Sequence, residues 1–235
     1  MTYQINGVVA SMHLRRVASA DIVRAVVSMA GDRVDLARTD GLRFWKLLGT
    51  GSGQTFTPND ADPTTWGMFA VWDSLVALRR FEEHSAVARR WRKAEEGWSA
   101  TLLPLTWKGR WSRQDPFDGV VPGVAVPGRR IAAITRARVK PSQWRAFAAA
   151  TPPVARVVNG TPGLAYTVGI GEAPIGLQGT FSIWDSTEAL RTFAYNSLEH
   201  RAVMNRTVTD RWYAEELFVR FGLLESDGTI GGRVI

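Results

Sequence analysis

Residues 66–74 read Trp-Gly-Met-Phe-Ala-Val-Trp-Asp-Ser, and residues 178–186 read Gln-Gly-Thr-Phe-Ser-Ile-Trp-Asp-Ser. The two stretches share Phe, Trp, Asp and Ser at matching places, and the match continues through residues 77–81 and 189–193. After a shift of four residues it also pairs His84 with His200. This period is too long for a solenoid repeat. The sequence therefore predicts two copies of one small domain in a single chain.

Hydrophobic periodicity around the two stretches predicts the same order of elements in each half. Strands are expected at 5–14, 42–49, 69–72 and 103–111, with helices at 19–36 and from a Ser74 cap to Trp98 in two pieces. The second half should have strands at 131–139, 164–170, 179–184 and 216–223, and helices at 142–150 and 186–212, broken near Asn196. This order, β-α-β-β-α-β, is ferredoxin-like.

The domain prediction follows from this order. It gives an N-terminal half at 1–112, a Pro/Gly-rich linker at 113–128 and a C-terminal half at 129–235. A four-stranded sheet with helices on one side leaves its other face bare. Pairing the two sheets into a barrel-like body would cover both faces with one shared core.

Composition limits the chemistry. The chain has no cysteine, which excludes disulfides, thiolate nucleophiles and iron–sulfur clusters. No stretch approaches the ~18–20 apolar residues that span a bilayer, so we expect a soluble, cytoplasmic protein. The net charge of +7 is compatible with an anionic membrane surface. The basic residues are scattered, and the densest group, 89–93, suits a solvated helix face, so we expect no nucleic-acid partner.

The three histidines are His13, His84 and His200. Their spacing fits no zinc-hydrolase motif. His13 lies in a predicted strand and is more readily structural. His84 and His200 occupy equivalent places, and each is a minority candidate for a metal ligand on spacing alone. The glycine-rich segment 49–55 lacks the Lys of a phosphate loop, so a loop in a β-hairpin explains it better.

The two copies differ most on one strand face. The first half carries Arg43, Trp45, Leu47, Gly49, Met68 and Ala70, where the second carries Ala165, Thr167, Gly169, Gly171, Thr180 and Ser182. Small residues would leave room for a flat ligand between the second sheet and its helix, with His200 as axial ligand. Closer packing of a partner sheet explains them equally well.

Several long motifs resemble the spheroidene monooxygenase family of carotenoid ketolases. They lie at 44–51, 56–58, 66–72, 107–111, 115–117, 133–137, 169–174, 178–184, His200 and 212–221. The resemblance runs from about Gly41 to the end. It implies an α+β fold, in which two tandem ferredoxin-like halves form a dimeric α+β barrel within one chain. It also implies haem b bound by the C-terminal half, with His200 as the proximal iron ligand and His84 as the alternative.

The resemblance further implies a haem-dependent monooxygenase that inserts oxygen from O₂ into a hydrophobic small molecule, using an external electron donor. Thr167, Gly169, Thr180 and Ser182 would line the cofactor site, and Lys46 and Arg43 would reach a propionate or the distal side. Other readings stay open: a peroxidase, a dehydratase-like or nitrogen-oxidising enzyme, or a ligand carrier without catalysis. A monomer would be complete, although exposed sheet edges allow a homo-oligomer. A long apolar substrate would need an apolar channel or peripheral membrane contact.

Overall fold

A computed structural model describes the chain apart from residues 1–6, 52–59, 144–159, 173–177 and 197–211. In the first half the elements are β1 (Val9–Arg16), a 3₁₀ turn (Ser19–Asp21), α1 (Ile22–Leu36), β2 (Leu42–Gly51), β3 (Ala61–Trp72), α2 (Leu75–His84), α3 (Ala86–Trp91) and β4 (Glu96–Gly109). They follow the order predicted from the sequence. One assignment is wrong, because Trp98 lies in β4 rather than at the end of a helix.

The second half begins with β5 (Ile131–Val139) and a 3₁₀ turn (Pro141–Gln143), followed by β6 (Leu164–Glu172) and β7 (Gln178–Trp184). It continues with α5 (Thr187–Asn196), β8 (Tyr213–Ile230) and the short β9 (Arg233–Val234). Most of the helix predicted at 142–150 and most of the second piece of the helix at 186–212 lie outside the described residues. Trp212, the predicted end of that helix, is buried and directly precedes β8.

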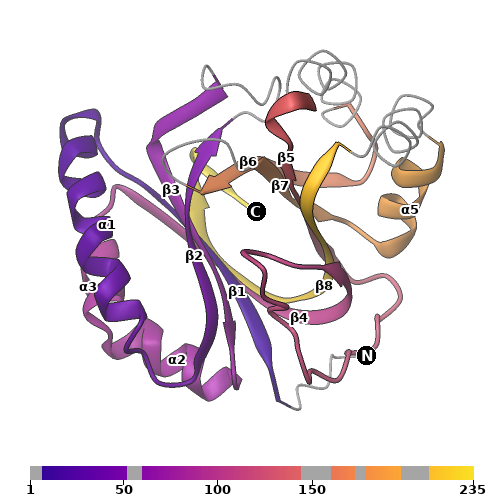
Figure 1. Cartoon of the computed structure of the whole chain (residues 1–235), viewed down its shortest axis with the longest axis horizontal. Helices are drawn as coiled ribbons and strands as arrows, with labels where there is room; N and C mark the ends of the chain where they lie inside the picture. Colours follow the sequence, from indigo (N-terminus) through magenta and orange to yellow (C-terminus); the bar gives the residue numbers. More distant parts are fainter. Residues whose placement is uncertain (1–6, 52–59, 144–159, 173–177, 197–211) are drawn as a thin grey trace.

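Within the described residues the strands form one sheet in the order β4-β1-β3-β2-β6-β7-β5-β8-β9. An additional antiparallel pairing of β4 with β8 joins the two ends of the eight long strands and closes them into a barrel. Helices α1, α2 and α3 cover one side of the barrel from outside, and α5 covers another (Figure 1). The halves meet at two seams: the long β4–β8 pairing and the shorter β2–β6 pairing.

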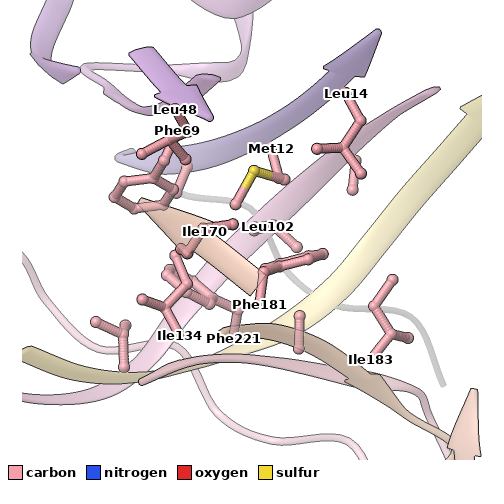
Figure 2. Packing of buried hydrophobic residues seen from close by; sticks show 14 of the residues in the cluster. Met12, Leu14, Leu48, Phe69, Leu102, Ile134, Ile170, Phe181, Ile183 and Phe221 are labelled. Carbon is pink, nitrogen blue, oxygen red and sulfur yellow. The ribbon is translucent and has the colours of Figure 1, made fainter. Parts of the chain in front are cut away.

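The barrel interior holds the main core, to which strands of both halves contribute. Figure 2 shows side chains from both halves converging there, among them Met12, Phe69, Phe181 and Phe221. The connector takes part as well, since Phe117 is 1% exposed and packs against Trp107 and Phe221. Apolar burial of this kind is the main stabilising term in folding. The shared core explains why the two halves pack as one body.

The repeated Asp-Ser pair builds the same helix start twice. Ser74 accepts a hydrogen bond from the Ala77 backbone N–H, and Ser186 accepts one from the Ala189 N–H. The preceding aspartates donate their backbone N–H groups to Gly41 and Gly163, respectively, each over 2.8 Å. Both glycines have positive φ, and a Cβ on either would approach the alanine Cβ to 2.6 Å. Only glycine fits such a position, so the repeat extends to backbone geometry.

Helix α1 differs from the simple amphipathic helix expected from its spacing. Its inner face buries Ala25, Met29, Asp32 and Leu36. Four of the valines counted toward the pattern point outward instead: Val23, Val26, Val27 and Val34 are 74%, 48%, 68% and 51% exposed. The helix is therefore apolar on its outer face as well as on much of its inner face. None of the described helices has the length and apolar run needed to cross a bilayer.

Candidate functional site

The candidate cofactor residues of the second half lie together on one face of the sheet. Strand register places Thr167 beside Ser182 and Gly169 beside Thr180. Strand β5 extends both rows, since Ser182 pairs with Ala133 and Thr180 pairs with Thr135. Ala133 packs in a cluster with Leu190 of α5, so these rows face the helices and not the barrel core. We call the six residues the thinned face.

The same two rows in the first half are filled by larger side chains. They read Trp45-Ala70-Ser11 and Leu47-Met68-His13 across β2, β3 and β1. Leu47, Met68 and His13 are 3%, 0% and 8% exposed under the helices. In the second half Thr180 is half-buried and Thr135, in the middle of an inner strand, is exposed. Ala133, Gly169 and Ser182 are buried, so the exposed part of the thinned face is confined to Thr135 and to parts of Thr167 and Thr180. The described side chains of this face are smaller than those of the packed first half, and this fits a flat ligand.

One residue of the thinned face also has a structural role. Ser182 accepts a hydrogen bond from the indole Nε1 of Trp184 over 2.9 Å. In the first half the equivalent Trp72 donates to Ser11, on the neighbouring strand β1, over 2.9 Å. The serine that accepts the hydrogen bond of the buried tryptophan therefore lies on β1 in the first half and on β7 in the second half. This hydrogen bond explains why the second half has Ser182 where the first half has Ala70, and it does so without any ligand.

His13 occupies the place of Thr135 and is buried among aromatic rings, with Ser11 Oγ 3.0 Å from its Nε2. Burial, together with the nearby Arg79 cation, lowers the pKa of His13 to about 4. The structural role expected from the sequence agrees with this packing. In the unfolded chain the pKa is about 6.5. Between these values the unfolded state binds the proton more tightly, so the free energy of unfolding falls as pH drops from 6.5 to 4.

We expect His13→Gln to flatten this pH dependence. The wild-type protein should lose about 3 kcal/mol more than the variant between pH 7 and pH 4, since each pKa unit corresponds to about 1.36 kcal/mol. Urea unfolding at a series of pH values measures the difference. His84→Gln is the matched control, because the His84 side chain is 73% exposed. Equal slopes in wild type and His13→Gln would contradict a buried, neutral His13.

The two candidate iron ligands differ in where they lie. His200 lies outside the described residues. His84 is the last residue of α2, with its Nε2 3.5 Å from a carboxylate oxygen of Glu83. The sheet face under α2 and α3 is already packed. In the described part of the chain no three His, Asp or Glu side chains gather in a group able to hold a metal ion.

Lys46 and Arg43 are not brought together with the thinned face. Lys46 lies on the same face of β2 as Phe44 and Leu48, which point into the barrel core. Its Nζ binds Ser112 Oγ at 2.6 Å and Glu172 Oε2 at 3.3 Å. Arg43 pairs with Asp73 at 3.3 Å and donates to the Asp118 carbonyl. Both line a surface groove of about 450 Å³ beside residues 42–47 of β2. The pairing of β2 with β6 begins after this stretch, at Leu48. In this structure they connect β2 to the connector and to β6.

A buried charge cluster at the β2–β6 seam was not predicted from the sequence. Arg136 is 2% exposed and binds the carboxylates of Glu172, at 3.2 Å, and Glu215. Its guanidinium lies over the ring of Trp111, whose Nε1 also donates to Glu172. Lys46 completes the set. A single arginine in a strand gives no sequence signal for such a cluster, although Arg136, Trp111 and Glu172 all fall within the family-like motifs.

Glu215 has a second set of partners in this cluster. The backbone N–H groups of Ser112 and Arg113, both with positive φ, point at its carboxylate. Burial alone raises the pKa of Glu215, but hydrogen bonds from Arg113, Arg136 and Ser112 outweigh it and lower the pKa below its ordinary value. The neighbouring Glu216 pairs with Lys108 instead. The two adjacent glutamates therefore form no catalytic dyad, as their spacing indicates.

Comparison with known sequences found close relatives. The chain is 32% identical over 227 residues to a spheroidene monooxygenase of Rhodobacter capsulatus, covering 96% of this chain and 94% of that protein. It is 33% identical over 205 residues to one of Cereibacter sphaeroides, and 32% identical over 194 residues to one of Rubrivivax gelatinosus. The match spans 61% of the length of the Cereibacter protein. No protein-family model matches the chain.

Solved structures show a similar fold. Two aldoxime dehydratase structures, one of them with bound butyraldoxime, align with TM-scores of 0.62 and 0.63 over 94% and 93% of this chain. The aligned residues make up 84% and 80% of the two dehydratase chains, and the sequence identities are 10% and 9%. At such identity the likeness concerns the fold alone. It supports an α+β architecture with a large antiparallel sheet.

Proposed function

Because this chain belongs to the spheroidene monooxygenase family, we propose that it is a monooxygenase acting on a hydrophobic small molecule. One oxygen atom of O₂ enters a C–H bond of the substrate, and the other leaves as water. The balance requires two electrons and two protons, and we assign the electrons to an external donor. The observation that carries the proposal is the match over nearly the whole length of the Rhodobacter protein.

The proposal extends to haem b on the thinned face, with His200 as the proximal ligand. When bound, the haem iron would supply the oxygen chemistry. The chain's own contribution is space and orientation. Gly169 presents no side chain, and the exposed Thr135 and half-buried Thr180 offer hydroxyls on the thinned face. Trp184, held by Ser182, limits this surface at one end. Lys46 and Arg43 bind Ser112, Glu172, Asp73 and the Asp118 carbonyl away from the thinned face, so the proposal gives them no part in the haem site.

The proposed architecture is two tandem ferredoxin-like halves, 1–112 and 129–235, joined by the 113–128 connector. The strand order supports it, since β4-β1-β3-β2 is repeated as β8-β5-β7-β6. The repeated helix starts at Ser74 and Ser186 support it as well. Under this proposal the first half is a packed support, and the second half carries the cofactor.

Replacing His200 tests the cofactor. Binding to the wild-type protein should shift and sharpen the Soret band of haemin. His200→Ala should leave the band close to that of free haemin, because the axial ligand is removed, and added imidazole should restore the shift. His84→Ala is the control and should behave as wild type. A shift that is lost only in His84→Ala overturns the ligand assignment, and a wild type that leaves the haemin band unchanged overturns haem binding. Product formed with O₂ and a reductant, but not with H₂O₂ alone, separates a monooxygenase from a peroxidase.

A second variant tests the location and keeps the ligand. Gly169→Leu/Thr180→Met gives the thinned face the side chains that fill the first half, Leu47 and Met68. We expect the haemin affinity to fall at least about tenfold, with unchanged far-UV circular dichroism. Arg138→Leu/Thr106→Met, at exposed places on β5 and β4, is the control. Unchanged affinity in the filled variant would remove the thinned face as the binding site.

A further inference from the structure

The outer face of α1 carries an apolar stripe that no described residue covers. Val23, Val27, Ala30 and Val34 recur at helical spacing and are all exposed, with Val26 beside them. The buried residues of α1 lie on the opposite side of the helix. In Figure 1 the helix forms the outer margin of the molecule, away from the barrel core. A soluble surface helix normally presents polar residues there.

Cations border this stripe. Helical spacing puts Arg24 on one side of the valines and Arg33 on the other, and both are exposed. The adjacent helix α3 contacts α1 and, with the turn after it, adds three exposed cations: Arg89, Arg92 and Lys93. Asp32 and Asp35 bind Arg90, and Asp21 binds Arg24 at 3.0 Å. The net positive charge around the stripe therefore comes from Arg33, Arg89, Arg92 and Lys93. The stripe therefore lies in a positively charged surround.

We propose that α1 docks on the surface of an anionic lipid bilayer, with the valine stripe in the headgroup boundary and the arginines on lipid phosphates. An apolar helix face bordered by Arg and Lys is the arrangement that binds such surfaces. Charge complementarity selects this occupant over a second copy of the chain. A twofold contact through the stripe would bring two identical sets of cations together. The inference stands on α1 and α3 and does not depend on the proposed oxygen chemistry.

Vesicle sedimentation tests the docking surface. We expect the full chain to sediment with vesicles of phosphatidylcholine and phosphatidylglycerol, to stay in solution with phosphatidylcholine alone, and to dissociate as salt rises. Val23→Ser/Val27→Ser should weaken partitioning about tenfold or more, because apolar burial in the boundary is lost. Arg24→Gln/Arg33→Gln should weaken it and reduce its salt dependence.

The matched control is Val121→Ser/Val124→Ser, which changes two valines of the connector that are 86% and 81% exposed. It should partition as wild type does. Equal loss in the control, or no vesicle binding by wild type, overturns the proposal. Light scattering adds a third outcome: a wild-type dimer that Val23→Ser/Val27→Ser converts to a monomer would assign the stripe to a second copy and overturn membrane docking. Circular dichroism verifies that each variant is folded.

Discussion

Arg136→Met should lower the free energy of unfolding by about 3–5 kcal/mol, the usual cost of removing one partner from a buried ion pair. Arg136 is 2% exposed and neutralises Glu172 and Glu215 at the seam between the halves. Methionine keeps most of the side-chain volume and removes the charge. The two carboxylates would then share the seam with Lys46 as their nearest cation. Urea unfolding at pH 7 measures the loss.

Arg138→Met, two residues along the same strand, is the control for the Arg136 variant. Its side chain is exposed, so the change should stay within about 0.5 kcal/mol. Glu172→Gln/Glu215→Gln combined with Arg136→Met should recover part of the stability, because no unpaired charge remains buried. A loss for Arg136→Met no larger than that for Arg138→Met would show that the cluster does not stabilise the seam.

Asp32→Asn should cost about 3–5 kcal/mol for a related reason in the first half. Asp32 is fully buried on α1 and accepts hydrogen bonds from Arg90 Nε at 2.8 Å and Trp91 Nε1 at 2.9 Å. It also lies 3.7 Å from Arg15, which sits over the Trp91 ring. Burial is the main cause that lowers the pKa of Arg15; Asp32 opposes it and Arg90 adds to it, with a net pKa of about 10. Without the carboxylate the two guanidiniums would face each other.

Asp35→Asn is the matched control for Asp32→Asn. Asp35 lies on the same helix, three residues after Asp32. It also pairs with Arg90, at 2.6 Å, but its side chain is 43% exposed. Exposed ion pairs contribute about 0–1 kcal/mol. Denaturant unfolding of both variants separates the effect of losing a buried charge from an effect on the helix. The double variant Asp32→Asn/Arg15→Met measures the coupling between Asp32 and Arg15. Similar losses for Asp32→Asn and Asp35→Asn would contradict the argument.

The strands of this protein could be predicted because the repeat gave two independent readings of each element. Trp98 was misassigned to a helix although Trp98, Ala100 and Leu102 alternate, as the residues of a barrel-facing strand do. The basic, helix-forming residues just before it masked this alternation. In α1 both faces carry apolar residues. The periodicity therefore predicts that this segment is a helix, but it does not predict which face of the helix is buried.

The candidate site was predictable only in part. Aligning the copies placed Thr167, Gly169, Thr180 and Ser182 on one face, and the strand register agrees. The hydrogen bond between Ser182 and Trp184 was not foreseen, because its counterpart in the first half uses Ser11 on another strand. Arg136 was not foreseen either. Its partners come from two other strands, and contacts between distant segments leave no local pattern in one sequence.

The closure of the barrel by β4 and β8 has a consequence for synthesis of the chain. Residues 96–109 find their partner on one edge only when residues 213–230 have been made. Until then β4 is an exposed edge strand. Core side chains that face the barrel interior, such as Phe69 of β3 and Trp98 of β4, lack the second half that covers them in the folded chain. Such long-range pairing folds slowly and favours aggregation of the incomplete chain. We therefore expect the first half made alone to aggregate more readily than the full chain, which has β8 to cover this edge.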